Sequence, residues 1–353
     1  MSSKLLQHLT ECLFLNRKAD KTGDYLSAIS RDEGSSSITR NEIMKNKKYD
    51  LTVIIPVYNT EAFLDKCLQS VLNEKTEYSI CVTIVNDGST DNSEAIIQQY
   101  SDEPGVRVIR QKNRGLSGAR NAGLKRIESR YVTFIDSDDC LPENGNSLDI
   151  LIRTADRLNA DIVQGGWETF TDDGNMSVVK KTVCPDAGKI SGYAWGKIYR
   201  SDLWNDICFP EKYWYEDTLI NMLIYSKCKK AVTVDSIVYR YRINPSGINL
   251  SSLGNPKSLD SLYITRLLIN DKISLGIPMT ERDLDIFFSQ IRMNIRRTLP
   301  LRDAYLQKCM FEEHRSLYLK AFSHLKTKDV KNRLLERALS QGSFRKYIIA
   351  TAF

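Results

Sequence analysis

The chain has 353 residues, of which 42% are hydrophobic and 27% charged, and its formal net charge is +6. This length and apolar fraction favour one large folded domain with an appendage and argue against a disordered tail or a scaffold segment. Eight cysteines occur without paired metal spacing and no apolar run is long enough to cross a membrane, so we expect a protein of the reducing cytoplasm.

Residues 1–50 are expected to form an N-terminal extension. Leucines at positions 5, 6, 9 and 13 have the spacing of a short amphipathic helix, and Gly-Ser-Ser-Ser at 34–37 is typical of a flexible linker. Charged side chains within the first 20 residues interrupt any secretory apolar segment.

From residue 51 to residue 164, short apolar runs alternate with helical periodicity. The runs predict strands at 51–57, 80–85, 106–109, 131–135 and 162–164, and the periodic segments predict helices at 63–72, 91–97 and 116–127. Strand alternating with helix predicts an α/β fold, with a mostly parallel open sheet flanked by helices and right-handed crossovers.

Polar residues follow three of the predicted strands, at Asn59, Asp87 and Asp136. The carboxyl ends of parallel strands share one edge of a sheet, and ligands of open α/β sheets bind outside that edge. Asp136 and Asp138 present acidic side chains two residues apart, which suits a hard divalent cation with oxygen ligands. A nucleotide diphosphate held through such a cation is the ligand that this pattern favours.

Each of these segments also has a simpler interpretation. Asn86-Asp-Gly-Ser89 has the composition of an ordinary turn, and Asp136-Ser-Asp-Asp139 that of a solvated loop or a helix cap. Glycines at 115, 118 and 123 resemble a phosphate loop, but no Lys-Ser or Lys-Thr follows them and the first strand lacks the dinucleotide fingerprint, so we set both of those readings aside.

Taken in order, the segments resemble those of family-two glycosyltransferases, which have the GT-A fold. The matching segments are Ile54-Ile-Pro-Val-Tyr-Asn59, Asn86-Asp-Gly-Ser-Thr-Asp91, residues 113–123, Asp136-Ser-Asp-Asp139 and, more weakly, residues 195–200 with 215–217. The resemblance covers residues 51–248. It implies inversion at the anomeric carbon of an activated donor, usually a UDP-sugar, with Mn²⁺ or Mg²⁺ as cofactor.

By the same resemblance, four segments form the nucleotide-sugar site. Asp87 corresponds to the residue that accepts a hydrogen bond from the uracil ring, and Asp136 to the acidic residue near the ribose. Asp138 corresponds to the ligand of the metal that bridges the diphosphate. The residues assigned to nucleotide-sugar binding are Pro56, Val57, Tyr58, Asn59, Glu61, Asp87, Gly88, Ser89, Asn113, Gly115, Leu116, Arg120, Asp136 and Ser137.

Transfer also needs a base that removes the proton of the acceptor hydroxyl. Glu216 and Asp217 are the candidates, because they follow the aromatic residues 213–215 and the resemblance sets them on the acceptor side; we favour Asp217. The alternative is that both acids lie in the first turn of a helix carrying apolar residues at 219, 220, 223 and 224, where they complement its dipole.

The resemblance places two further segments, residues 195–200 in the acceptor half and a later one near the donor. Lys197 and Arg200 are candidates for contacts with the diphosphate or an anionic acceptor, and the alternative for Arg200 is an exposed charged face. Residues 239–247 resemble a late loop near the donor, where many relatives have a histidine. The histidines of this chain are at 8, 314 and 324, which leaves water to complete any metal shell.

Positive charge is concentrated after residue 250, where 18 lysines and arginines face 10 aspartates and glutamates. Leucine and isoleucine spacing predicts helices there. Basic helices beside a sugar transferase suggest docking on an anionic membrane surface, with Arg292, Arg296 and Arg297 as one patch. A helical subdomain with a solvated basic face, or a homo-oligomer interface, stays open as the alternative; no nucleic-acid module accompanies the charge.

The sequence therefore predicts three regions: an extension (1–50), a GT-A glycosyltransferase domain (51–250) and a basic helical region (251–353). We expect a cytoplasmic enzyme, peripheral at the inner face of the membrane, that moves a hexosyl or N-acetylhexosaminyl group to a hydroxyl of a growing glycan, glycolipid or glycoprotein acceptor. The alternatives are a transferase acting on polyprenyl phosphate and a non-catalytic partner subunit that binds a nucleotide sugar.

Overall fold

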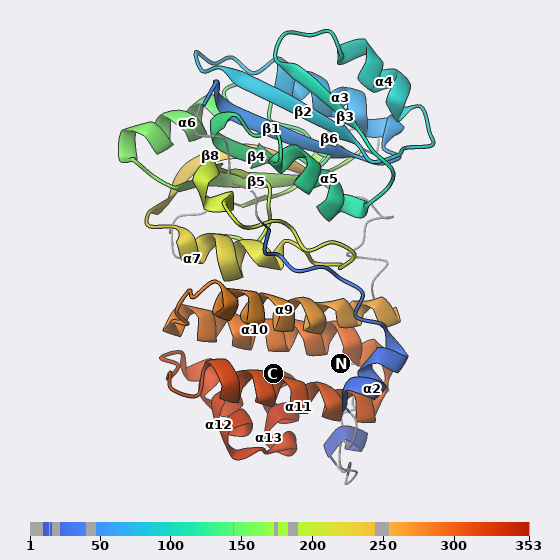
Figure 1. Cartoon of the computed structure of the whole chain (residues 1–353), viewed down its shortest axis with the longest axis vertical. Coiled ribbons are helices and arrows are strands. Elements are labelled where there is room, and N and C mark those ends of the chain that lie inside the picture. Colours follow the sequence, from blue (N-terminus) through green and yellow to red (C-terminus); the bar gives the residue numbers. More distant parts are fainter. Residues whose placement is uncertain are drawn as a thin grey trace. The chain divides into compact units, whose positions relative to one another are not determined.

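The computed structural model describes residues 10–13, 15, 22–39, 47–143, 145–172, 176–182, 190–243 and 254–352. Their contacts form two compact units. The α/β unit comprises the described residues of 37–212 and 219–245, and the helical unit comprises those of 1–36, 213–218 and 246–353 (Figure 1). The division into three consecutive domains stays a prediction. Of the helix predicted through the N-terminal leucines, only residues 10–13 are described, and they are helical.

The α/β unit is built on a sheet of eight strands in the order β3-β2-β1-β4-β7-β5-β6, with β8 paired to β5. The pairs β1–β2, β1–β4, β2–β3 and β5–β8 are parallel, whereas β7 runs antiparallel to β4 and β5, and β6 antiparallel to β5. The predicted α/β class with a mostly parallel sheet is confirmed. The strands are β1 (Tyr49–Val57), β2 (Ile80–Asn86), β3 (Val106–Arg110), β4 (Ser129–Phe134), β5 (Ile162–Asp172), β6 (Met176–Thr182), β7 (Lys197–Arg200) and β8 (Ala231–Arg242).

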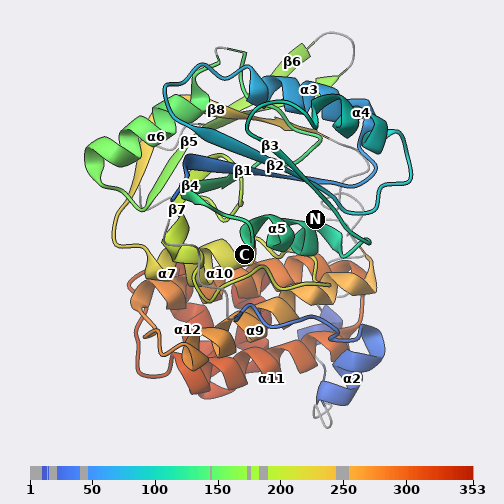
Figure 2. The same ribbon diagram turned by 45° about the horizontal axis from the view of Figure 1, so that its top comes forward.

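Helices cover both faces of this sheet. Figure 2 shows α3, α4 and α6 along one face and α5 on the other. Residues 51–57 of β1 are buried throughout, as expected of a central parallel strand that is covered on both sides, and they pack with apolar side chains of α3 and α6. The helices are α3 (Glu61–Leu72), α4 (Ser93–Tyr100), α5 (Gly115–Leu124), α6 (Ser147–Leu158) and α7 (Tyr225–Lys227), the last preceded by a π-helical turn at Ile220–Ile224.

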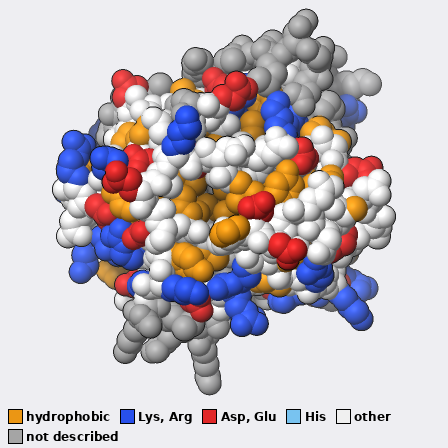
Figure 3. Space-filling model, turned by 90° about the horizontal axis from the view of Figure 1, so that it is seen from above, with side chains coloured by type: hydrophobic (Ala, Val, Ile, Leu, Met, Phe, Trp, Pro, Cys, Tyr) orange, Lys and Arg blue, Asp and Glu red, His pale blue; other side chains and the backbone are white. Residues whose placement is uncertain are grey.

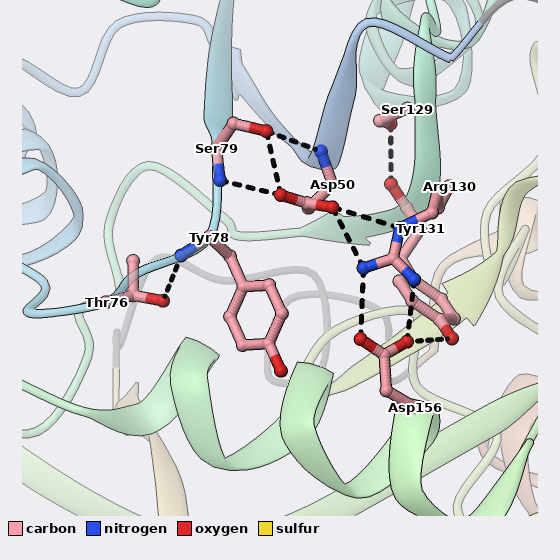
Figure 4. Close-up of polar contacts among 8 residues, drawn as sticks. All are labelled: Asp50, Thr76, Tyr78, Ser79, Ser129, Arg130, Tyr131 and Asp156. Carbon is pink, nitrogen blue, oxygen red and sulfur yellow. Dashed lines mark hydrogen bonds and ion pairs between the residues drawn. The ribbon is translucent and has the colours of Figure 1, made fainter.

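An ion-pair network joins the amino ends of the strands (Figure 4). Asp50 accepts hydrogen bonds from the backbone N–H and hydroxyl of Ser79, both at 2.8 Å, and pairs with Arg130 at 2.8 Å. Arg130 also donates two bonds to Asp156 of α6, at 2.7 and 3.0 Å, and the Tyr131 hydroxyl donates to the same carboxylate at 2.9 Å. Burial and the bond to Asp156 raise the pKa of Tyr131 to about 12. The network fixes the start of β1, β2 and β4 relative to α6.

In the part of the helical unit that the structure describes, α2 packs against α11, one of the helices α9 to α13 from the C-terminal third of the chain. Lys272 and Asp283 form a buried ion pair at 2.5 Å between α9 and α10, and Asp283 also closes the capping box with Thr280 that begins α10. Burial lowers the pKa of His314 to about 3. The helices are α2 (Thr22–Ile29), α9 (Asp260–Ser274), α10 (Glu281–Thr298), α11 (Ala304–Ala321), α12 (Arg333–Gln341) and α13 (Phe344–Ala352).

The three arginines predicted to form one exposed patch on α10 do not do so. Arg296 is exposed, but Arg292 donates to the side-chain oxygen of Asn332 at 2.8 Å and to the carbonyl of Lys331 at 2.9 Å. The guanidinium carbon of Arg297 lies 3.4 Å from the centre of the Tyr215 ring. The patch prediction is therefore wrong, because helical spacing gathers side chains but does not tell which of them are used in packing. Within the described residues, no helix is both long and apolar enough to span a membrane.

Candidate active site

The carboxyl ends of β2, β1 and β4 lie side by side at one edge of the sheet. Val57 is in register with Asn86, and Ile54 with Phe134, so the segments that follow these strands leave the sheet together. The backbone N–H of Asp87 donates to the carbonyl of Val57 at 2.9 Å, which extends the pairing past the strand end. The sequence prediction that these polar segments meet at one edge is confirmed.

Side chains tie the loops after β1 and β2 to each other. The side-chain oxygen of Asn59 accepts from the Thr90 backbone N–H at 2.8 Å, and Asn59 itself adopts a left-handed φ of 52°. Glu61 accepts from the Asn92 backbone N–H at 2.7 Å, while its own N–H donates to Asp91 at 2.9 Å. Glu61, which the resemblance assigned to nucleotide-sugar binding, thus also joins these two loops.

Asp87 is 2% exposed and lies under the segment that follows β3. Its Oδ1 accepts from the side-chain amide of Gln111 at 2.6 Å and from the backbone N–H of Arg114 at 2.9 Å. Gly88 makes the close approach possible: its φ is 77°, and a Cβ there would lie 3.0 Å from the backbone nitrogen of Asn113. Gln111 was not predicted from the sequence, although its position just after a strand of the same edge was the available signal.

The segment after β3 leads into α5. The Asn113 side chain accepts from the Gly115 backbone N–H at 3.0 Å, and Leu116 on the first turn is 36% exposed. Tyr58, at the end of β1, is also exposed, at 47%. Arg120 lies deeper: it is 2% exposed and pairs with Asp136 at 2.7 Å. Its role in the structure is therefore to hold an acidic side chain of the β4 turn.

Three aspartates follow β4, and each has a different environment. Asp136 pairs with Arg120, Asp138 is half-buried, and Asp139 is buried. Asp139 accepts from the Tyr239 hydroxyl at 2.6 Å and from the Arg242 backbone N–H at 2.7 Å. Asp139 is thus the anchor of this turn, and neither of its partners was singled out in the sequence.

The same turn is joined to β1 and β8. Ser137 accepts a hydrogen bond from the Thr60 hydroxyl at 3.0 Å, and the Arg242 guanidinium donates to the backbone carbonyl of Asp138 at 2.6 Å. Residues 239–247 were assigned to a loop, but 239–242 belong to β8, because they continue its parallel pairing with β5 as far as Phe170. Residues 244–247 lie outside the described residues.

The acidic turn fits a hard divalent cation. Burial raises the pKa of Asp139 well above its ordinary value, and the neighbouring charges of Asp138 and Asp136 raise it further. Among the residues described, no group of three or more His, Cys, Asp or Glu side chains is placed to hold a metal. Two carboxylates with substrate phosphates and water are nevertheless the usual ligand set of Mg²⁺.

The residues predicted for the acceptor half lie in two different places. Lys197 on β7 is fully buried and donates to Ser191 Oγ at 2.9 Å and to the Tyr193 carbonyl at 2.5 Å, so it braces residues 191–193. Arg200 pairs with Asp161 at 2.9 Å. Glu216 and Asp217 belong to the helical unit, in a turn closed by the Thr218 N–H bond to the Tyr215 carbonyl at 3.1 Å. Helical structure begins at Thr218, as predicted.

A pocket of about 300 Å³ lies between α3 and residues 140–145, with Lys66 and Arg240 in its wall. Arg240 belongs to the segment 239–247 that the sequence placed near the donor, but none of the residues assigned to catalysis, nucleotide-sugar binding or the metal lines this pocket. Figure 3 looks onto the α/β unit, where apolar side chains gather in a hollowed middle and most basic side chains lie toward the margins.

Comparison with known proteins supports this fold. Residues 52–213 match the family model described as Glycosyl transferase family 2. This domain of the chain belongs to that family. The matched residues include Asn59, Asp87 and the Asp136–Asp139 turn, whereas Tyr239 and Arg242, and the base candidates Glu216 and Asp217, follow them in the chain.

Two curated relatives extend the match. Glycosyltransferase GlyA of Streptococcus pneumoniae serotype 4 is 31% identical over 270 residues, covering 69% of this chain and 38% of GlyA. The putative glycosyltransferase EpsH of Bacillus subtilis is 29% identical over 221 residues, covering 56% of this chain and 62% of EpsH. The chain thus spans less than two thirds of the length of either relative.

Among solved structures, residues 1–349 of S. aureus TarS in complex with UDP are similar to this chain. The TM-score is 0.60 and the sequence identity 19%, with 86% of this chain and 90% of the TarS chain covered. A second TarS structure of the same extent, at the same TM-score, is in complex with UDP-GlcNAc. At this identity the likeness concerns the fold, and it extends well beyond the family domain.

Proposed function

We propose that the chain transfers a sugar from a UDP-sugar to a hydroxyl group of a growing glycan. The observation that carries the proposal is the polar edge formed by Asn59, Asp87 and the Asp136–Asp139 turn in a domain of this family. The TarS structures with UDP and UDP-GlcNAc support a uridine nucleotide as the part of the donor that carries the sugar.

Asp87 is suited to recognising uracil. Both hydrogen bonds recorded for its carboxylate end on Oδ1, and among the described residues Oδ2 accepts none. A carboxylate oxygen that accepts no bond within the protein can accept the ring N–H of uracil. The exposed Tyr58 and Leu116, with Asn59, Gly88, Ser89 and the start of α5, would then line the nucleotide and its sugar.

Asp138, with Asp136 beside it, would hold Mn²⁺ or Mg²⁺. The cation would supply positive charge to the departing diphosphate when it is bound. The ion pair with Arg120 holds Asp136 in place, and the hydrogen bonds to Asp139 fix the turn on which Asp138 lies. The positions of Asp136 and Asp138 are therefore set by other residues of this chain.

Asp217 is the proposed base. Of the two acids in its turn, Glu216 is 7% exposed whereas Asp217 is more accessible, which favours Asp217 as the group that meets an acceptor. Asp217 takes the proton of the acceptor hydroxyl, the acceptor oxygen forms a bond to the anomeric carbon, and the bond from that carbon to the UDP oxygen breaks. Attack opposite the leaving group inverts the anomeric centre.

The experiment is a measurement of UDP release from UDP-glucose, UDP-galactose, UDP-GlcNAc and UDP-GalNAc, each with Mn²⁺, with Mg²⁺ and with excess chelator. We expect metal-dependent release from at least one donor. Release stimulated only by polyprenyl phosphate would support the lipid-phosphate alternative. UDP binding without release from any donor would support a non-catalytic partner subunit.

We also propose that the helical unit docks on anionic membranes. Arg333 and Arg337, one turn apart on α12, are exposed, and Val330 and Leu334 beside them are 70% and 40% exposed. Basic side chains interspersed with exposed apolar ones are typical of surfaces that bind at the membrane interface. Such docking would bring the enzyme to a lipid-linked acceptor.

A further inference from the structure

The short segment Tyr213–Thr218 belongs to the helical unit, although the chain on both sides of it belongs to the α/β unit. The Tyr213 hydroxyl donates to Asp32, and the Trp214 backbone N–H donates to Asp260 at 2.9 Å. Gly34 lies against the Tyr213 ring, where a Cβ would come within 1.8 Å of a ring carbon. The helical unit therefore holds this segment through two hydrogen bonds and the packing of Gly34 against the Tyr213 ring.

Tyr215 is the strained residue of the segment. Its φ is 66°, in the left-handed region that a bulky side chain rarely adopts, and its ring is buried. Such a conformation persists only where the surroundings enforce it, and it is found most often at functional sites. Tyr215 begins the turn that carries Glu216 and Asp217, so its conformation sets the direction of both acids.

Arg297 of α10 is the side chain that covers Tyr215. Its guanidinium carbon lies 3.4 Å from the ring centre, which is stacking distance. Burial lowers the pKa of Arg297, while the nearby Tyr215 and Asp217 act in the opposite direction. Its Nη1 is buried and has no hydrogen-bond partner within the described part of the chain. The guanidinium is thus held by stacking and by negative charge rather than by a full set of hydrogen bonds.

The helix that presents Arg297 is firmly fixed. The capping box of Thr280 and Asp283 sets its start, and the buried ion pair between Lys272 and Asp283 joins it to α9. Near its other end, the backbone carbonyl of Arg297 accepts from Ser258 Oγ at 3.2 Å. A group on a rigid helix is well suited to fixing the direction of a side chain that it contacts.

We infer that Arg297 is a positioning residue for Asp217, holding the turn through Tyr215 and keeping a positive charge near the proposed base. This inference rests on the proposed function, because it assigns to Arg297 a role in the reaction that Asp217 performs. It also gives the helical unit a part in catalysis that is separate from membrane docking.

The test compares Arg297→Gln, Arg297→Lys, Asp217→Asn and the double variant Arg297→Gln/Asp217→Asn, with Arg296→Gln as the matched control. Arg296 is the adjacent exposed arginine of the same helix, so its replacement removes the same charge without touching Tyr215. For each protein, kcat and KM are measured with the UDP-sugar that the wild type turns over, together with the UDP dissociation constant and the melting temperature.

We expect Arg297→Gln to lower kcat at least tenfold, with KM and UDP affinity within twofold of wild type. Arg297→Lys keeps the charge but loses the planar stack, so it should lower kcat at least threefold. The double variant should be no slower than Asp217→Asn within twofold, because an arginine that acts through Asp217 has nothing left to position. Arg296→Gln should equal wild type.

Wild-type kcat in Arg297→Gln, or losses that multiply in the double variant, would overturn the inference and leave the proposed function intact. If Arg297→Gln does not fold, Arg297→Lys decides, and a wild-type kcat there overturns the inference. A wild type that releases UDP from no donor would instead refute the proposed function.

Discussion

The three aspartates after β4 have the same chemistry and different surroundings. The Arg120 guanidinium fixes Asp136, two donors from β8 hold Asp139, and Asp138 lies between them with greater access to solvent. Because a carboxylate that already accepts two hydrogen bonds in the interior has little left to offer a ligand, the partners decide which aspartate can bind a cation. This reasoning favours Asp138 over Asp139.

Asp138→Asn should lower UDP release at least about 100-fold, because the charge that holds the cation is lost. A bound cation stabilises the transition state by several kcal/mol. The melting temperature should stay near that of wild type, since the residue lies in a partly exposed turn. Asp139→Asn is the informative comparison: replacing the buried anchor should cost about 1–3 kcal/mol of stability and lower the melting temperature. Full activity of Asp138→Asn, or of wild type in excess chelator, would rule out the metal assignment.

Asp87 and Asp217 are expected to divide nucleotide binding and proton removal. Asp87→Ala should weaken UDP binding about 10- to 100-fold, because a hydrogen bond to a charged group contributes about 1.5–3 kcal/mol. It should also lower the melting temperature, since the Gln111 amide and the Arg114 N–H lose their acceptor. Asp217→Asn should lower kcat about 100- to 10,000-fold, the usual contribution of a general base, with UDP affinity within twofold of wild type. Calorimetry that finds equal losses of UDP affinity in the two variants would contradict this division.

At the scale of secondary-structure elements, the two edges of the sheet have different tasks. The carboxyl edge carries the proposed site, whereas Asp50, Arg130 and Asp156 cross-link the amino edge. Partial burial alone would raise the pKa values of Asp50 and Asp156. Asp50 accepts hydrogen bonds from Ser79 and Arg130, and Asp156 accepts them from Arg130 and Tyr131. These bonds outweigh burial and lower both pKa values. Both carboxylates therefore favour the folded state when they are ionised.

This network predicts a pH-dependent contribution to stability. With folded-state pKa values below the unfolded value of about 4, the contribution is complete above that pH and is lost as pH falls through the folded values. Asp156→Asn should cost on the order of 1 kcal/mol at pH 7, because the pair is partly exposed. Thermal melts should show the gap between variant and wild type closing as pH falls below about 4.

UDP affinity provides the control for this variant. Asp156 lies at the opposite edge from Asp87, so Asp156→Asn should bind UDP like wild type at pH 7. A stability gap that stays constant from pH 8 to pH 3 would show that the carboxylate charge does not contribute as described.

At the scale of the whole molecule, the helical unit combines residues that are far apart in the sequence. Arg266 of α9 pairs with Asp32 and with Glu313 of α11, and Tyr25 of α2 donates to Asp303 at 2.6 Å. The extension that the sequence analysis treated as a separate region thus contributes described residues 22–36 to this unit. Several of the basic residues counted after residue 250, among them Arg266 and Lys272, form ion pairs inside it.

Exposed basic charge should still bind anionic membranes. The protein should sediment with vesicles containing 30% phosphatidylserine more than with neutral vesicles, and less as salt rises, because exposed charges are screened within about 8 Å at physiological ionic strength. Arg333→Gln/Arg337→Gln should weaken this binding about 10-fold or more, at about 1 kcal/mol per side chain. UDP release in solution should not change.

Arg153→Gln/Arg157→Gln on α6 is the matched control for vesicle binding, because these two arginines are also exposed and four residues apart. It should bind vesicles like wild type. Equal sedimentation with neutral and anionic vesicles would remove the support for membrane docking and leave the helical unit with its proposed role at Tyr215 and Asp217.

The sequence by itself determined the α/β class, the first five strands and the polar edge after β1, β2 and β4. These follow from local patterns: a buried parallel strand reads as a continuous apolar run, and its carboxyl end reads as the polar residues after it. The family resemblance rested on the same segments, and it was carried by their order along the chain.

Only the tertiary structure decided how individual polar side chains are used. The sequence made Lys197 a candidate for contact with the diphosphate or an acceptor and Arg297 part of a membrane-facing patch. In the structure Lys197 braces residues 191–193 and Arg297 stacks on Tyr215. The sequence placed Gln111 just after a strand of the site edge and residues 239–247 near the donor. It did not show that Gln111 holds Asp87 or that Tyr239 and Arg242 hold Asp139. The reason is physical: Gln111 lies 24 residues from Asp87 and Arg242 lies 103 residues from Asp139, so the fold alone brings these partners together.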